Sequence, residues 1–181
     1  MKRRHVPVLL STLVLALSSP SIAAFKSKGE PEVGFVAVGP AGLKINGKTS
    51  KLTAVERDEV LSVKVPLTNL ETGIGLRDKH LRKYLDVAKY PTAALNVRRS
   101  QLKVPEDGKS SSGRATGAFT LHGTTKQLPF KYQMKRKGPS YWVRGTSSLD
   151  IRDYGIEVPC YLGICVEPTV KLDVKFQLED R

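Results

Sequence analysis

Few residues in this chain are of the types that enzymes use for catalysis or metal binding. The 181 residues include two Cys and three His. Of the histidines, only His80 and His122 lie beyond the first 24 residues. Two His without a third ligand make a poor metal site. The motifs Gly-x-Ser-x-Gly and His-Glu-x-x-His do not occur, and we expect no phosphate-binding loop. A Ser-His-Asp site stays open, since its members meet in space rather than in sequence. The residue types nevertheless favour a protein without catalytic activity, bound metal or cofactor.

The two cysteines, Cys160 and Cys165, are separated by four residues. This spacing differs from the Cys-x-x-Cys of redox pairs, and in an oxidising compartment it favours a structural disulfide. In the chain-entropy treatment, a bridge across so short a loop stabilises the fold by about 2 kcal/mol. A redox-active pair is the alternative.

The first 24 residues have the pattern of an export signal. A basic start at positions 2–4 precedes a mainly apolar stretch, and small residues follow up to Ala24. The apolar stretch is too short to span about 30 Å of hydrocarbon comfortably, which argues against an uncleaved membrane anchor. We therefore expect cleavage after Ala23 or Ala24. Residues 25–181 would then form one periplasmic domain without an N-terminal lipid anchor.

Apolar and polar residues alternate along most of the remaining chain, which is typical of strands with one buried face. The last segment shows the alternation best, with Val170, Leu172 and Val174 between Lys171, Asp173 and Lys175. About eight strands are predicted, at Val33–Val38, Leu43–Val55, Leu61–Leu67, Ala93–Val104, Ala115–Leu121, Leu128–Met134, Tyr141–Ile151 and Val170–Leu178. Polar loops and tight turns such as His122-Gly123-Thr124 join them as antiparallel hairpins.

One segment departs from this alternation. Within residues 77–88, Leu81, Leu85 and Ala88 have the i, i+4, i+7 spacing of one helix face, and Pro91 follows. We predict an all-β fold in which eight antiparallel strands close or stack, with one short helix inserted between strands.

Small residues at inward-facing positions leave two interpretations of the interior open. They are Ala115, Gly117, Gly145 and Ser147. Either they leave space for a ligand, as some eight-stranded barrels do, or the glycines relieve barrel corners.

Three motifs occur in order along the chain. The first spans residues 72–91, with Thr-Gly, Arg-Asp-Lys-His-Leu and Ala-Lys-Tyr-Pro; the second is Gly-Ala-Phe-Thr-Leu-His-Gly-Thr-Thr-Lys at 117–126; the third is Ile-Arg-Asp-Tyr-Gly-Ile at 151–156. Their order and spacing resemble the YceI-like family of exported bacterial lipid-binding proteins, over about Val33 to Leu178.

The resemblance implies a lipocalin-like, eight-stranded antiparallel barrel. Its apolar cavity would take a polyisoprenoid or similar long-chain lipid, for binding or transport rather than catalysis. Burial of an apolar chain contributes about 25 cal/mol per Å², and a dry interior suits such a ligand. The candidate cavity residues are Phe35, Phe119, Leu121, Phe130, Tyr132, Val143, Val174 and Phe176.

Polar residues of the motifs are candidates for a second role. Arg77, Asp78 and His80 are candidates to gate the cavity or bind a lipid head group. The alternative is an Arg77–Asp78 ion pair that fixes the entrance of the helix. Similarly, Arg152 and Asp153 are expected to form an ion pair at a strand end.

The chain is basic, with 30 Lys and Arg against 17 Asp and Glu and a net charge of +13. Basic clusters at 135–137 and within 77–83 would attract anions. Because export separates the protein from the chromosome, an anionic membrane surface is a better partner than nucleic acid. The alternative function is a non-enzymatic envelope or stress protein with a filled barrel, which acts through its basic surface.

Overall fold

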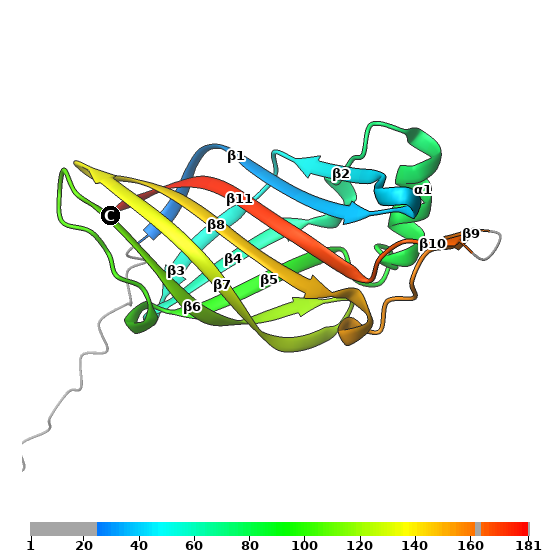
Figure 1. Cartoon of the computed structure of the whole chain (residues 1–181). Coiled ribbons are helices and arrows are strands. Elements are labelled where there is room, and N and C mark those ends of the chain that lie inside the picture. Colours follow the sequence, from blue (N-terminus) through cyan, green and yellow to red (C-terminus); the bar gives the residue numbers. More distant parts are fainter. Residues whose placement is uncertain (1–24, 162–163, 181) are drawn as a thin grey trace, which may run out of the picture.

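Long antiparallel strands make up most of the structure (Figure 1). Apolar residues at their alternating positions form the buried clusters of the interior. The computed structural model describes residues 25–161 and 164–180. Its strands are β1 (Phe25–Val38), β2 (Lys44–Thr49), β3 (Thr53–Arg57), β4 (Val60–Pro66), β5 (Thr92–Arg98), β6 (Ser110–Leu121), β7 (Thr124–Lys137), β8 (Ser140–Asp150), β9 (Cys160–Tyr161), β10 (Ile164–Cys165) and β11 (Thr169–Asp180).

Eight of these strands close into a ring. The hydrogen-bonded order is β1, β3, β4, β5, β6, β7, β8 and β11, and β11 pairs again with β1. All of these pairings are antiparallel. Closure pairs both sides of each strand and turns the apolar faces toward one interior. The predicted eight-stranded antiparallel barrel is therefore confirmed.

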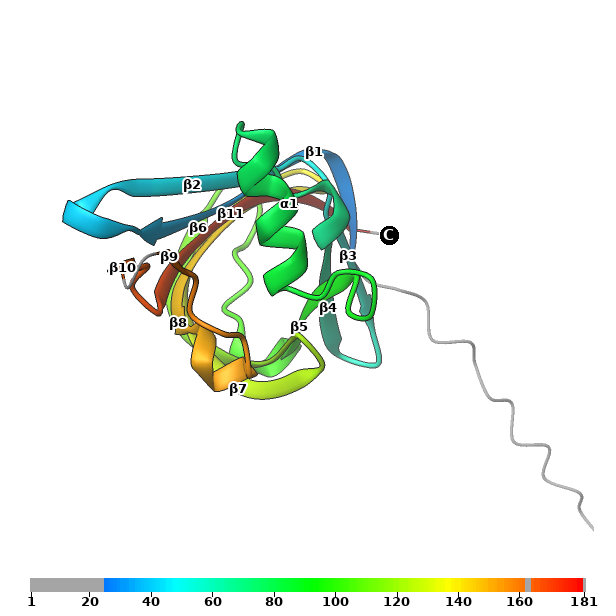
Figure 2. The same ribbon diagram turned by 90° about the vertical axis from the view of Figure 1, so that its right-hand side faces the viewer.

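The predicted strand at Leu43–Val55 divides into β2 and β3. β2 pairs with the second half of β1, from Val33↔Thr49 to Val38↔Lys44, whereas β3 meets β1 only at Lys26↔Val55. β2 therefore lies outside the ring, although residues Val33–Val36 of β1 stay paired with β11 on their other side. We call the pair β1–β2 the ribbon, and its free end projects from the barrel (Figure 2). At its base, the backbone groups of Lys48 and Glu71 exchange two hydrogen bonds of 2.8 and 2.9 Å. This contact joins the ribbon to the segment that precedes the helix.

β5 is shorter than the predicted strand Ala93–Val104, because it ends at Arg98 and a 3-10 turn follows at Arg99–Gln101. Its ladder with β6 has three residue pairs, from Ala94↔Thr120 to Asn96↔Ala118. Side chains partly replace the missing ladder: the Gln101 Oε1 atom accepts a hydrogen bond of 3.0 Å from the Thr116 N–H. Apolar residues at 102 and 104 continue the predicted alternation without belonging to a strand.

The described residues contain one α-helix, α1 (Gly75–Tyr84), which lies across one end of the barrel (Figure 2). Leu81 and Leu85 pack partly buried, as predicted, but Ala88 is exposed and Val87 is buried instead. The reason is that the helix ends at Tyr84 and Asp86 has a positive φ of 43°, which changes the direction of the chain. No helix in the described part of the chain is long and apolar enough to span a membrane.

Two hairpins have two-residue turns in which both central residues have positive φ. They are Asp58-Glu59, at 49° and 60°, and His122-Gly123, at 50° and 75°. Such turns match the twist of the paired strands and favour Gly at the second position. The turn predicted at 122–124 is therefore confirmed.

The interior holds two clusters of buried apolar side chains, one in each half of the barrel. The first includes Phe25, Leu61, Met134 and Phe176. The second lies toward α1 and includes Leu70, Leu121 and Tyr154, with Leu81 and Leu85 of the helix against it. The helix thus completes the core at its own end of the barrel.

Candidate functional site

Two apolar cavities lie inside the barrel. The inner cavity, of about 120 Å³, is lined by residues such as Leu61, Met134 and Phe176 of the first cluster. The helix-end cavity, of about 200 Å³, is lined by the second cluster and by the inner side of α1. Phe119, Leu172 and Val174 border both cavities and separate them. A cavity of about 150 Å³ with apolar walls is large enough for one small apolar molecule.

All eight predicted cavity residues lie on these walls. Phe130, Tyr132, Val143 and Phe176 line the inner cavity, Phe35 and Leu121 line the helix-end cavity, and Phe119 and Val174 border both. The strand alternation points them inward, which is why their position follows from the sequence. The alternation also contained a signal for other lining residues that the prediction omitted, namely Leu128, Met134 and Leu172. The lining residues of α1 were omitted as well.

The polar groups near the inner cavity are hydrogen-bonded to the backbone. The Ser147 hydroxyl donates to the carbonyl of Pro129 at 2.7 Å. The Tyr132 hydroxyl accepts from the Lys103 N–H at 2.7 Å. In the described residues no buried side-chain nitrogen or oxygen lacks a partner. The interior therefore offers no unsatisfied polar group to a ligand, and a hydrocarbon chain suits it best.

The small inward-facing residues divide between the two interpretations that the sequence left open. Gly145 and Ser147 line the inner cavity and so leave space. Gly117 does not, because a Cβ atom there would lie 2.7 Å from the Leu95 Cδ1 atom and 2.9 Å from Val97. Side chains of β5 already occupy the space that a side chain at position 117 would need.

The wall of the helix-end cavity is formed by α1 on one side and by residues near the β9–β10 hairpin on another. Leu81, Tyr84 and Leu85 line it from the helix. Pro159, Val166 and Glu167 line it next to the hairpin, and Glu167 is the only charged residue on either cavity wall in the described chain. The surface of the cavity itself is wholly apolar, so Glu167 contributes no polar atom to it.

The three gate candidates have separate positions. Asp78 is buried and accepts hydrogen bonds from the Thr72 N–H, at 2.7 Å, and from the Thr72 hydroxyl. Arg77 donates to the Thr72 hydroxyl and to the Thr72 carbonyl, both at 2.8 Å. His80 is exposed on α1. Arg77 and Asp78 thus fix the turn before the helix through Thr72, rather than through the ion pair that we expected between them.

The same hydrogen bonds affect the acidity of Asp78. The Thr72 hydroxyl and N–H stabilise the carboxylate and hold the pKa of Asp78 below its usual value, and the charges of Arg82 and Arg77 act in the same direction. None of the three gate candidates lines either cavity. A role in gating stays a prediction.

The expected pairing of Arg152 with Asp153 is wrong. Arg152 pairs with Asp150, with Nη2 and Oδ2 2.6 Å apart, and Asp153 pairs with Lys126 across 3.1 Å. Asp150 also caps the 3-10 turn at Ile151–Tyr154, where its carboxylate accepts from the Arg152 N–H. These hydrogen bonds lower the pKa of Asp150. The motif at 151–156 is therefore a structural corner of the barrel.

An ion pair that the sequence did not reveal lies at the opposite end of the barrel. Glu56 of β3 is buried and lies 2.7 Å from the Arg99 guanidinium. That guanidinium also stacks over the ring of Phe25, 4.2 Å from its centroid. Since β4 begins beside these residues and leads to α1, the pair and the helix are at opposite ends. A buried ion pair thus lies beside the apolar cluster at the end of the barrel remote from the helix.

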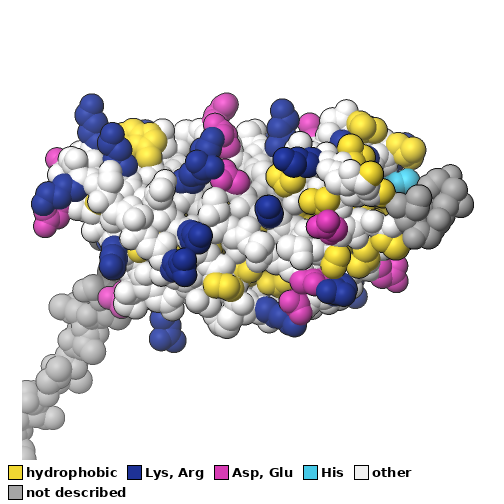
Figure 3. Space-filling view, viewed as in Figure 1, with side chains coloured by type: hydrophobic (Ala, Val, Ile, Leu, Met, Phe, Trp, Pro, Cys, Tyr) yellow, Lys and Arg dark blue, Asp and Glu magenta, His cyan; other side chains and the backbone are white. Residues whose placement is uncertain are grey.

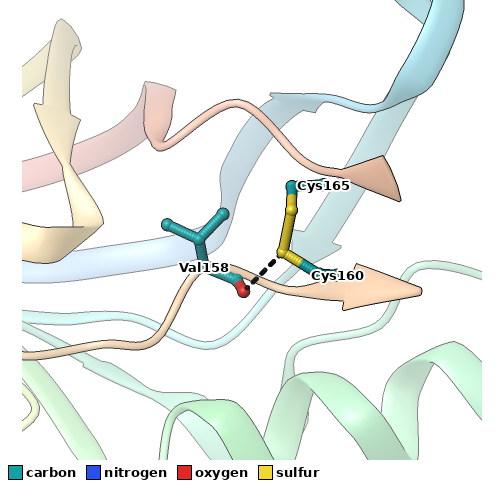
Figure 4. The surroundings of a disulfide bond; sticks show 3 residues. All are labelled: Val158, Cys160 and Cys165. Atoms are coloured by element: carbon teal, nitrogen blue, oxygen red, sulfur yellow. Dashed lines mark hydrogen bonds between the residues drawn. A yellow bond between two sulfur atoms is a disulfide. The ribbon is translucent and has the colours of Figure 1, made fainter. Parts of the chain in front are cut away.

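The predicted disulfide between Cys160 and Cys165 is confirmed (Figure 4). It joins the two-residue strands β9 and β10, where these cysteines lie directly opposite each other. The Cys160 sulfur is 3.4 Å from the Val158 carbonyl oxygen. An oxidised sulfur has no hydrogen to donate, so this is a close contact rather than a hydrogen bond.

The remaining histidine has a structural position. The Nδ1 atom of His122 lies 3.1 Å from the Tyr154 carbonyl oxygen, and its ring packs edge-on against Tyr90. Among the described residues, no group of three or more His, Cys, Asp and Glu could hold a metal ion.

One short match to a nucleotide-binding motif is explained by the fold. Residues 42–49, Gly-Leu-Lys-Ile-Asn-Gly-Lys-Thr, fit the pattern of a phosphate-binding loop, which we had expected to be missing. That loop must lie between a strand and a helix so that its N–H groups surround a phosphate. Here Lys44–Thr49 is strand β2, paired with β1 and followed by β3. The match therefore does not indicate a nucleotide site.

Comparison with known families identifies the fold and its motifs. A family model described as "YceI-like domain" matches residues 25–178. The chain belongs to the YceI-like family. Related YceI-like proteins, each named "UPF0312 protein", are found in Pseudomonas. The protein of Pseudomonas savastanoi pv. phaseolicola is 32% identical over 125 residues, which cover 65% of this chain and 60% of the relative. That of Pseudomonas putida strain F1 is 26% identical over 177 residues, 88% of this chain and 90% of the relative.

Solved structures share the barrel. A polyisoprenoid binding domain from Saccharophagus degradans superimposes with a TM-score of 0.74 at 16% identity, over 88% of this chain and all of that chain. BcnA of Burkholderia cenocepacia gives a TM-score of 0.65 at 14% identity, over 81% of this chain and 95% of that chain. At these identities the likeness establishes the YceI-like fold. The apolar cavities then show that this member of the family has internal space suited to a lipid.

Proposed function

We propose that this YceI-like protein binds and carries a polyisoprenoid or similar long-chain lipid inside its barrel. The observation that carries the proposal is the pair of adjoining cavities inside the barrel, whose surfaces are almost wholly apolar. A lipid chain gains about 25 cal/mol for each Å² that it buries, and it leaves no polar group unsatisfied there. The structural neighbour named as a polyisoprenoid binding domain supports the same ligand class.

The protein is a carrier rather than an enzyme in this proposal, and it acts in the periplasm. The residues at 1–24, which lie outside the described part of the chain, would direct export and be removed. The disulfide is in keeping with an oxidising compartment. Intact mass and N-terminal sequencing of protein from the periplasmic fraction test this step. A chain that begins at residue 24 or 25 is expected, and a full-length cytosolic chain would contradict export.

Native mass spectrometry followed by organic extraction tests the ligand. Protein purified from its own envelope should carry an apolar adduct of defined mass, and Phe176→Ser should lose it because a hydroxyl would enter the inner cavity wall. Trp142→Ser is the matched control, since Trp142 is exposed on β8 and pairs with Gln177, the neighbour of Phe176 on β11. A clean apo mass that a polyprenol add-back does not change would overturn the proposal. Retention of the lipid by folded Phe176→Ser would show that the assigned cavity is wrong.

A further inference from the structure

Among the residues that the structure describes, three of the four exposed large apolar side chains are at the helix end of the barrel. Leu43, at the tip of the β1–β2 ribbon, is 61% exposed, and Ile74 and Leu76, at the start of α1, are 54% and 66% exposed. The fourth, Trp142, is 41% exposed on the outer face of β8. Both the ribbon tip and the helix project from the same end of the molecule (Figure 1), where hydrophobic side chains gather on the surface (Figure 3). We call Leu43, Ile74 and Leu76 the apolar tips.

The outer face of α1 continues this surface with positive charge. Leu76, Lys79, His80 and Lys83 are exposed and have the i, i+3, i+4, i+7 spacing of one helix face. The only acidic residue of the helix, Asp78, is buried and hydrogen-bonded to Thr72.

The ribbon repeats the combination, since the exposed Lys44 follows Leu43. The exposed acidic residues Glu71 and Glu167 lie on other segments, although their backbones bond to the ribbon at Lys48 and Val38. In both the ribbon and the helix, exposed apolar side chains are therefore followed along the chain by exposed lysines.

The inner face of the same helix lines the helix-end cavity. Leu81, Tyr84 and Leu85 turn toward that cavity, while Leu76 and Lys79 turn toward solvent. A helix with its side chains is about 10–12 Å across. The cavity thus lies one helix diameter behind the surface that carries the apolar tips.

We propose that the helix end docks on an anionic lipid bilayer. The apolar tips enter the boundary between head groups and acyl chains, and Lys44, Lys79 and Lys83 contact the phosphate groups. Apolar residues backed by cations are the combination that binds peripheral proteins to anionic bilayers. Docking in this orientation places the helix-end cavity next to the membrane. This inference rests on the proposed function, because docking is where the lipid would be loaded and released.

Co-sedimentation with lipid vesicles tests the docking surface. The probes are vesicles of phosphatidylethanolamine with phosphatidylglycerol and vesicles of phosphatidylcholine alone. Wild type should bind the anionic vesicles, less so at high salt. Leu76→Ser should weaken binding about tenfold, as expected for one Leu side chain withdrawn from an apolar phase. Leu43→Ser/Ile74→Ser/Leu76→Ser should abolish binding, and Lys79→Glu/Lys83→Glu should remove the preference for anionic vesicles.

Trp142→Ser is the matched control, because it removes an exposed large apolar residue at a site away from the tips. It should bind like wild type. Equal binding by the triple variant and Trp142→Ser would overturn the proposal, as would failure of wild type to bind anionic vesicles. A change from dimer to monomer in the triple variant would assign the apolar tips to a second copy of the chain and would also overturn it.

Lipid extraction separates this proposal from the proposed function. If the protein carries lipid but does not bind vesicles, the proposed function stands and the proposed docking surface is wrong. If the protein binds vesicles through the apolar tips but neither carries nor takes up lipid, the docking surface stands and the proposed function is wrong. In the triple variant, bound lipid should be retained while transfer of a fluorescent polyprenol between anionic vesicles falls at least tenfold.

Discussion

Phe119 has the largest side chain of the three residues that border both cavities. Its ring packs edge-on against Tyr154, 5.7 Å between centroids. Each cavity separately has room for a short apolar segment, whereas a long lipid needs both. Truncation of Phe119 should therefore open the most space between the two cavities.

We predict that Phe119→Ala joins the cavities and shifts the bound lipids toward longer chains. The measurement is native mass spectrometry after incubation with polyprenols of increasing length. Phe130→Ala is the control, because Phe130 lines the inner cavity but not the helix-end cavity. Both variants should lose about 2–3 kcal/mol of stability, since each removes a partly buried aromatic ring. The same shift in chain length for both variants would mean that Phe119 is not the divider.

At the level of elements, the sequence predicted strands well wherever alternation was uninterrupted. β6, β7 and β11 contain the predicted segments and extend beyond them, and β8 matches its predicted segment except at Ile151, which begins a 3-10 turn. The errors arose where a strand bends or stops without a break in the alternation, as between β2 and β3 and after Arg98. Local periodicity records which side chains face inward, but it does not record which neighbour the backbone pairs with. For the same reason the partners of Arg152 and Glu56 could not be predicted, because strand register decides them.

The start of α1 depends on one carboxylate, and this makes its stability depend on pH. Because the pKa of Asp78 is lower in the folded protein than the value of about 3.9 in an unfolded chain, its ionised form stabilises the fold. That contribution is present above about pH 4 and disappears as the pH falls through the lower, folded value. We predict that Asp78→Asn is less stable than wild type at pH 7 and that the difference shrinks below pH 4.

Urea unfolding of both proteins between pH 7 and pH 3 measures this difference. Other carboxylates with a lowered pKa, such as Asp150, titrate in both proteins and cancel in the comparison. Lys79→Gln, on the outer face of the same helix, controls for general effects on α1. A constant difference between wild type and Asp78→Asn down to pH 3 would show that the charge of Asp78 is not what stabilises the helix start.

The disulfide hairpin is the second element beside the helix-end cavity. Strands of two residues are too short to be stable alone. The hairpin is held by the disulfide and by backbone hydrogen bonds from Val166 to Pro159, 2.9 Å, and from Glu167 to Val38, 2.7 Å. Pro159, Val166 and Glu167 line the cavity. The bridge therefore fixes part of the cavity wall as well as the chain.

We predict that Cys160→Ser/Cys165→Ser lowers stability by about 2 kcal/mol, which corresponds to a fall in Tm of about 4–8 °C. It should also release bound lipid faster, because the wall beside α1 is less constrained. Differential scanning fluorimetry and the rate of lipid transfer to acceptor vesicles are the measurements. Unchanged release from a destabilised variant would limit the disulfide to a role in folding.

At the scale of the whole molecule, a barrel with empty apolar space is less stable than one with a lipid inside. A ligand that binds only the folded state stabilises it by RT ln(1 + [L]/Kd), about 2.7 kcal/mol at a hundredfold excess over Kd. For a domain of this size that amounts to about 5–11 °C in Tm. We predict that delipidation lowers Tm by about this amount and that a polyprenol restores it. The filled-barrel alternative predicts no change, since a protein acting through its basic surface gains nothing from an apolar ligand. Phe176→Ser should abolish the rise in Tm on addition of polyprenol, and Trp142→Ser should retain it. An equal rise in Tm in both variants would show that the lipid acts unspecifically on the outer surface.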